Sequence, residues 1–185
     1  MYIISEPING NMYYKFIDFL LERSDTYLFV LPNMGKTLVN ERNRKLMSEY
    51  PVGYSYEEDP KLHKIYIKNT RKSVCLIEQD IISKCVDTGY LDQVTSIEME
   101  VFHSKISDRT KEFLYKVDDF GKWLYPYFPE DICFFCEGKC IFQCVSHENL
   151  LLLYLDNRDV RDFLKKEDIN FERNIKIKAP KLCEL

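Results

Sequence analysis

Apolar side chains recur at the 3.6-residue spacing of a helix in two long stretches of the sequence. The first stretch follows the turn residues 9–11 and runs to about Arg23, with apolar positions at Tyr13, Phe16, Ile17 and Leu20. The second follows the capping pair Ser107-Asp108 and stops before Pro126, with apolar positions at Phe113, Leu114, Val117, Phe120 and Leu124. Both patterns predict amphipathic helices that bury one face. A shorter amphipathic helix is predicted over Asp159–Lys166.

Short apolar or alternating segments between these helices predict strands. The predicted strands span residues 26–31, 52–56, 63–68, 74–77, 97–102, 150–155 and 171–177. Residues 132–145 predict a hairpin that turns at Glu137-Gly138-Lys139. The remaining predictions are a solvated helix or long loop over 37–50, a turn over 69–72 and a short helix over 81–86.

The order of these elements predicts the fold class. Strands and helices mix without the regular βαβ spacing of a parallel sheet, which favours an α+β fold with a mainly antiparallel sheet and two to four helices. The 185 residues contain no repeat, low-complexity tract or flexible linker. We therefore expect a single domain over residues 1–185.

Composition and charge narrow the partners and the compartment. The chain is 45% hydrophobic with a net charge of −4, which opposes broad binding to nucleic acid, although a local basic patch is compatible with it. No apolar run reaches membrane-spanning length, so we expect no membrane partner. Seven cysteines are an odd number, and the start lacks the pattern of a secretion signal. These features predict reduced thiols and a cytoplasmic location.

Four cysteines and one histidine crowd into the predicted hairpin, and they are the clearest candidate for chemistry. They are Cys133, Cys136, Cys140, Cys144 and His147. Zinc takes four tetrahedral sulfur or nitrogen ligands, usually from two close pairs. A zinc protein that uses the four cysteines, or His147 in place of one of them, is therefore one hypothesis. A regulatory disulfide in this cluster is another.

Packing is the interpretation that we favour for these cysteines. Positions 133 and 136 point to opposite faces of an extended strand, because its side-chain period is two. The residues between the sulfurs are apolar and aromatic, as in a buried sheet. A turn at 137–139 would place Cys136 opposite Cys140, Ile132 opposite Cys144 and Phe134 opposite Phe142. Cysteine would then act as a small hydrophobic residue, and no cofactor is expected.

The aromatic run at 123–129 is the candidate contact surface for a partner protein. Its rings either close one end of the core or form an exposed ledge beside carboxylates. Under the second interpretation, the contact residues are Trp123, Tyr125, Tyr127, Glu130, Asp131, His147 and Glu148. A third hypothesis assigns a hydrolase or nuclease activity to His147 and the nearby carboxylates, which the hairpin would bring together.

Residues 129–148 resemble a hairpin pattern in small bacterial proteins of the toxin-immunity type. The residues that carry this resemblance are Pro129 to Phe135, Gly138-Lys139-Cys140 and Val145 to Glu148. The resemblance covers about 20 of 185 residues and transfers no catalytic residue. It implies a cytoplasmic protein that binds another protein, such as a cognate toxin, and blocks it by occlusion. The sequence does not indicate an oligomeric state.

Overall fold

The computed structural model describes residues 1–32, 60–87, 99–124, 128–155 and 157–174. Its α-helices in this part of the chain are α1 (Gly10–Leu21), α3 (Pro60–Ile77), α4 (Asp108–Leu114) and α5 (Arg158–Lys166). Its strands are β1 (Tyr2–Ile4), β2 (Thr26–Pro32), β3 (Ile81–Asp87), β4 (Met99–Lys105), β5 (Glu130–Cys136), β6 (Lys139–Val145), β7 (Leu150–Leu153) and β8 (Glu172–Arg173). Short 3-10 turns are η1 (Glu78–Asp80), η2 (Phe120–Lys122) and η3 (Ser146–Glu148).

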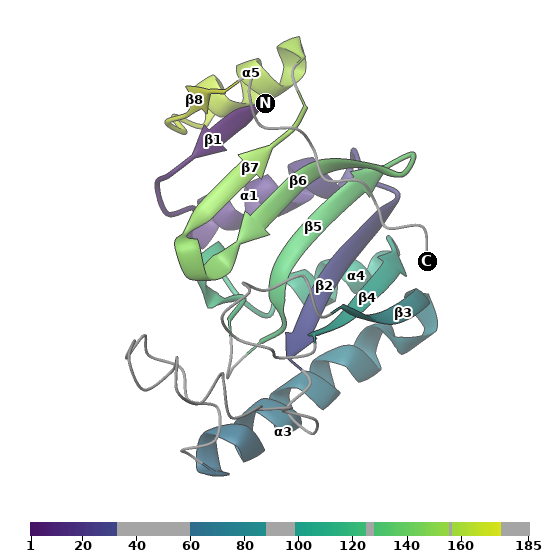
Figure 1. Cartoon of the computed structure of the whole chain (residues 1–185). Helices are drawn as coiled ribbons and strands as arrows, with labels where there is room; N and C mark the ends of the chain where they lie inside the picture. Colours follow the sequence, from purple (N-terminus) through teal and green to yellow (C-terminus); the bar gives the residue numbers. More distant parts are fainter. Residues whose placement is uncertain (33–59, 88–98, 125–127, 156, 175–185) are drawn as a thin grey trace, which may run out of the picture.

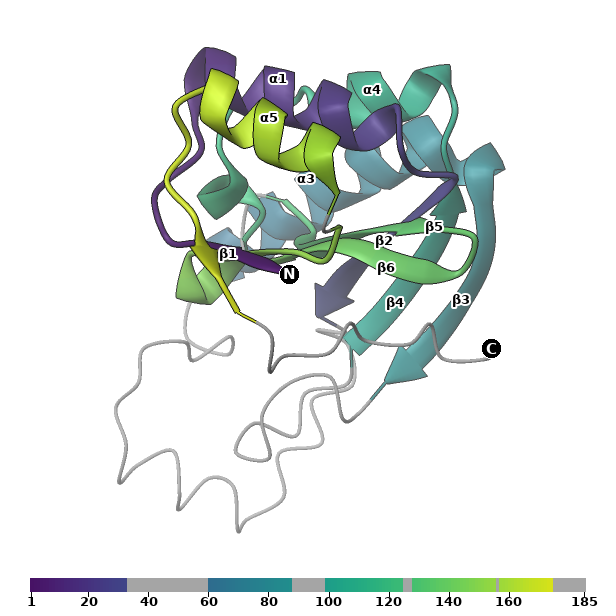
Figure 2. The same cartoon turned by 90° about the horizontal axis from the view of Figure 1, so that it is seen from above.

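The eight strands form one sheet in the order β3-β4-β2-β5-β6-β7-β1-β8, and every neighbouring pair is antiparallel. Helices α1, α4 and α5 lie together on one face of this sheet (Figures 1 and 2). Helix α3 belongs to the same side, because its Ile77 is part of the core beneath them. The predicted α+β class with a mainly antiparallel sheet is therefore confirmed.

The core between the helices and the sheet is rich in aromatic rings. Phe142 on β6 contacts Phe16 of α1, Phe120 of η2 and Phe134 of β5, with ring centroids 5.1–6.0 Å apart. All four side chains are at most 2% exposed. Because α1 buries the positions that its apolar spacing selected, the first predicted helix is confirmed. Burial of these rings removes a large apolar area from water and so stabilises the fold.

Residues 63–77 form one helix, so the strands predicted at 63–68 and 74–77 and the turn at 69–72 are wrong. The buried positions of α3 include Thr70, Ser73 and Ile77, which follow helical spacing. Because two of these three are polar, the apolar pattern hides the helical period. Pro60 is the first residue of α3, a position that proline favours, and it was the available signal.

Two further elements differ from the prediction. Residues 81–87 form the strand β3, because pairing with β4 decides a segment too short for its period to be read. Helix α4 begins after Ser107, as predicted, but it ends at Leu114 and the chain continues through η2. The predicted elements at 37–50 and 52–56 lie outside the described residues.

The hairpin and the third helix agree with the sequence patterns. Strands β5 and β6 turn at Glu137-Gly138, and Phe134 lies opposite Phe142 as expected. Glu137 and Gly138 both have positive φ, the backbone of a type I′ hairpin turn, which suits the glycine. Helix α5 begins at Arg158, where the Asn157 side chain accepts a hydrogen bond from the Val160 amide at 2.9 Å.

Candidate functional site

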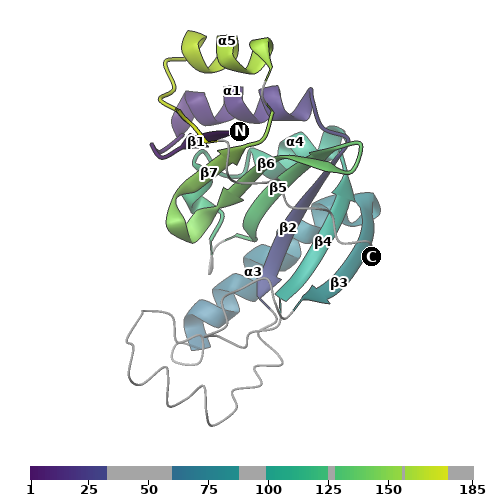
Figure 3. The ribbon, with the colours of Figure 1, turned by 45° about the horizontal axis from the view of Figure 1, so that its top comes forward.

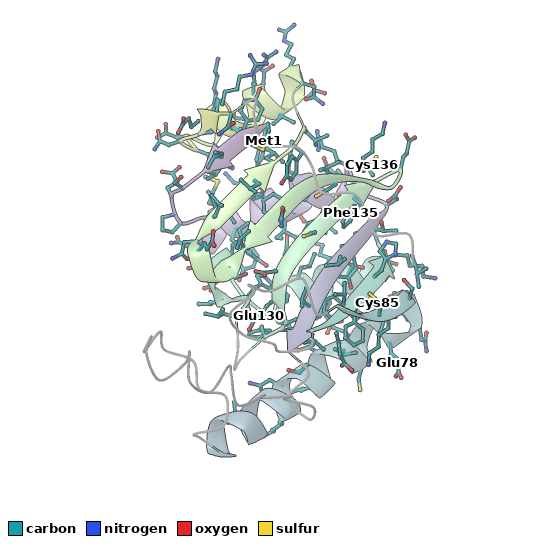
Figure 4. The ribbon with its side chains drawn as sticks, viewed as in Figure 1. Met1, Glu78, Cys85, Glu130, Phe135 and Cys136 are labelled. Carbon is teal, nitrogen blue, oxygen red and sulfur yellow. The ribbon has the colours of Figure 1, made fainter. Side chains whose placement is uncertain are left out.

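The four hairpin cysteines divide between the two faces of the sheet. Cys133 and Cys140 cluster with Phe135 on the face away from the helices. Cys144 lies in the main core, and Cys136 packs against that core. Figure 4 shows Cys136 beside Phe135 near the turn end of β5. Since these sulfurs point to opposite sides of a sheet, they do not converge on one ion, and the described residues contain no group placed to hold a metal.

A β-bulge explains why one predicted cysteine pair is wrong. The ladder shifts between Phe134 and Phe135, so Cys136 pairs with Lys139 and Phe135 with Cys140. Cys136 and Cys140 are therefore not opposite one another. The extra residue of the bulge changes the register that a simple three-residue turn would impose.

Burial also makes two of these thiols poor nucleophiles. It raises the pKa of both Cys140 and Cys144 to about 12, so both are protonated at neutral pH. Each thiol contacts a nearby oxygen: Cys140 Sγ lies 3.4 Å from the Phe142 carbonyl and Cys144 Sγ 3.3 Å from Ser146 Oγ. These cysteines act as small core residues, as the packing interpretation holds.

Trp123 does not lie on a contact surface. Its side chain is fully buried, and its indole Nε1 donates a hydrogen bond to the Tyr13 hydroxyl at 3.0 Å. The ring also packs against Phe113 and Phe128. The prediction for this residue is wrong because α4 ends early and η2 carries the chain back into the core.

Glu130 and Asp131 are also buried, each only 3% exposed, so their assignment to a contact surface is wrong. Asp131 Oδ1 accepts a hydrogen bond from the Ser146 amide at 2.8 Å and thereby ties β5 to η3. Glu148 is exposed, as a contact residue would be. Tyr125, Tyr127 and the His147 side chain lie outside the described part of the structure.

A shallow hollow lies beside Cys144 and Ser146 and is also lined by Glu6, Asp119 and Asn149. It has space for about one water molecule, which is far less than an organic substrate needs. Glu6 is moreover occupied, because both of its carboxylate oxygens accept hydrogen bonds from Asn170. We therefore assign no substrate site to this hollow.

Helix α3 carries the strongest local charge among the described elements. Its sequence contains five basic residues and no acidic one, namely Lys61, Lys64, Lys68, Arg71 and Lys72. Since the whole chain carries −4, the remainder carries a net −9. A basic helix on an acidic protein is a marked charge asymmetry. The sequence analysis does not predict this charge asymmetry, because it divides the segment into two strands and a turn.

Four residues of α3 are described as exposed, Ile65, Lys68, Lys72 and Cys75, and we call the first three the α3 stripe. Steps of three and four residues place them in one row on the helix. Ile65 is 41% exposed, and only Ile82 joins it among the large hydrophobic side chains that the structure describes as exposed. Figures 1 and 3 show the N-terminal end of α3 projecting beyond the strands.

The two lysines of the α3 stripe differ from many cations elsewhere on the surface. Lys15, Lys84 and Lys111 each form an ion pair with a neighbouring carboxylate. Within the described residues, no carboxylate pairs with Lys68 or Lys72. As far as the described residues go, a partner can therefore contact these two charges without breaking an ion pair.

The end of α3 is held in place by a buried carboxylate. Asp80, in η1 directly after the helix, accepts hydrogen bonds from the Arg109 Nε and Nη2 atoms at 3.1 and 2.9 Å. It also accepts one from Ser107 Oγ at 2.6 Å. These bonds, with the Arg109 guanidinium first among the causes, lower the pKa of the Asp80 carboxyl. The network fixes α3 to the start of α4.

No helix within the described ranges is both long and apolar enough to cross a membrane. Comparisons of the chain with protein-family models, with curated proteins and with solved structures gave no significant match. The geometry of the α3 stripe is therefore the basis for the function proposed below.

Proposed function

We propose that this protein acts by binding another protein and that the α3 stripe is part of the contact surface. The exposed row of Ile65, Lys68 and Lys72, in which neither lysine pairs with a described carboxylate, carries this proposal. Exposed lysines can attract a partner of opposite charge, and an apolar residue beside them can be buried on contact. We propose this surface in place of the one around Trp123, because Trp123, Glu130 and Asp131 are buried.

The resemblance of residues 129–148 to toxin-immunity proteins suggests a cognate toxin as the partner and occlusion as the mechanism. An antiparallel sheet with a helix anchored at its C-terminal end is compatible with that role, because occlusion needs a stable shape and no catalytic group. The six cysteines in the described part of the chain are free thiols, which supports action in the reducing cytoplasm.

The experiment compares capture of partners by three forms of the full chain in an extract of its source cells. The test variant is Lys68→Glu/Lys72→Glu. The control is Arg161→Glu/Lys165→Glu on α5, where both residues are exposed, four positions apart and change the charge equally. We expect one or more proteins that the wild type and the control retain and the α3 variant loses, as measured by quantitative mass spectrometry.

A captured protein should then be tested for toxicity by expression alone and together with this chain. A toxin is expected to arrest growth alone and to be neutralised by the wild type but not by the α3 variant. Identical protein sets from all three forms would refute the contact surface. A partner that is harmless alone would refute the immunity role.

A further inference from the structure

We infer that the surface that α3 recognises is acidic and contains an apolar recess, so that the partner's carboxylates contact Lys68 and Lys72 while Ile65 enters the recess. This inference rests on the proposed function and adds the chemistry of the partner. Ile65 and Lys72 are seven residues apart, which is about 10 Å along a helix axis. The complementary surface therefore needs an apolar recess and carboxylates within about that distance.

Charge on the rest of the molecule favours a protein partner over nucleic acid. A duplex carries one negative charge for about every 1.7 Å of its axis, so its charge extends well past a stripe of this length. The remainder of this chain carries a net −9 and would repel that continuation. A protein can confine its carboxylates to the contact area, which avoids this repulsion.

The exposed side chain of Ile65 also favours a protein partner over nucleic acid. The side chain is 41% exposed and has no polar atom to offer a phosphate. On a protein surface, burial of the exposed part of this side chain would be favourable, because it removes apolar surface from water. An anionic bilayer would also accept an isoleucine, but its charged plane would extend over the acidic remainder of the chain.

The C-terminal half of α3 is anchored to the rest of the protein. Thr70, Ser73 and Ile77 bury the opposite side of α3, and Asp80 fixes its C-terminal end to α4. A surface that is ordered before binding loses little conformational entropy on contact. Helix α3 is thus presented in the manner of a helix that docks into a groove.

The test uses the full chain labelled with ¹⁵N and three defined probes. The first probe is a helical peptide with leucines along one face, flanked by glutamates four residues apart. The others are a 12-base-pair DNA duplex and vesicles of phosphatidylcholine with phosphatidylglycerol. We expect the peptide to shift the amide signals of Ile65, Lys68 and Lys72 and to bind more tightly than the duplex or the vesicles.

Two variants report on charge. Lys68→Glu/Lys72→Glu should weaken peptide binding by at least about tenfold, because two exposed attractions become repulsions. Lys68→Gln/Lys72→Gln should weaken peptide binding less. This variant replaces the charge-reversal variant in the test if the latter does not fold. The Arg161→Glu/Lys165→Glu control on α5 and a peptide with lysine in place of glutamate identify effects of net charge.

The inference is overturned if the peptide does not shift these amides, if the α3 and α5 variants lose binding equally, or if the duplex or the vesicles bind more tightly. If α3-dependent capture of a partner is observed but the acidic peptide shifts none of these amide signals, the proposed function stands. Only the inferred acidic and apolar character of the partner's surface is then refuted. No α3-dependent capture would refute the function itself.

Discussion

Replacing Asp80 by Asn should destabilise the protein by about 2 kcal/mol, because the variant loses at least one hydrogen bond between charged groups. The wild-type carboxylate accepts three hydrogen bonds, two from the charged Arg109 guanidinium and one from the neutral Ser107 hydroxyl. Asparagine keeps the shape and one acceptor oxygen, but it presents an NH₂ group to these donors.

The size of the effect follows from where the partners lie. The Asp80 side chain is inaccessible to solvent, whereas Arg109 is 43% and Lys105 58% exposed. Water therefore screens the charges of Arg109 and Lys105. The loss of stability in Asp80→Asn thus stays well below that of breaking a deeply buried ion pair. For a domain of this size, about 2 kcal/mol corresponds to a decrease of about 4–8 °C in Tm.

The assay is urea unfolding of both proteins at several pH values, with Glu112→Gln as control. Glu112 is 65% exposed and lies 4.0 Å from Lys116, so its replacement should change stability by less than about 0.5 kcal/mol. Because the pKa of folded Asp80 is lowered, its stabilisation is complete above the unfolded value of about 3.9 and is lost as pH falls towards the folded value.

The difference between wild type and Asp80→Asn should therefore be constant between about pH 7 and 5 and narrow below about pH 4. A difference no larger than that of Glu112→Gln at pH 7 would refute the anchoring role of this carboxylate. A difference that grows as pH falls would refute the assigned direction of the pKa shift.

Two further predictions test the burial of Trp123 and of the thiols. The only tryptophan, Trp123, is fully buried against Phe113 and Phe128. It should therefore show blue-shifted fluorescence and weak quenching by acrylamide in the folded protein. Strong quenching would show that Trp123 is exposed to solvent. At pH 8, iodoacetamide should modify Cys75 rapidly and Cys140 and Cys144 only on unfolding, since Cys75 is exposed and thiols with a pKa of about 12 are almost wholly protonated. Mass spectrometry of peptides gives the three rates, and equal rates would contradict the structure.

In the hairpin, local sequence patterns predict some features of the candidate site and not others. Its strands, its turn and the Phe134–Phe142 pair could be predicted because alternation and a glycine turn are local features. The bulge after Phe134 could not, since it depends on how β5 also pairs with β2 and β6 with β7. That bulge decides which cysteine faces which neighbour.

The candidate surface was missed for a related reason. Charge was assessed over the whole chain, where −4 conceals a helix with five basic residues and no acidic one. Only the assignment of residues 60–77 to one helix places Ile65, Lys68 and Lys72 in a row. At Trp123 the sequence allows either a core position or an exposed ledge, and the structure shows the core position.

By itself, the sequence determined the α+β class, the helix at 10–21, the hairpin and the short helix near the end, because each depends on periodicity within a few residues. The tertiary structure alone decided that residues 60–77 are a helix, that Trp123, Glu130 and Asp131 are buried, and that the thiols divide between two faces. Burial depends on contacts between segments far apart in the chain, such as Trp123 with Tyr13 and Asp131 with Ser146. A local pattern carries no record of those contacts.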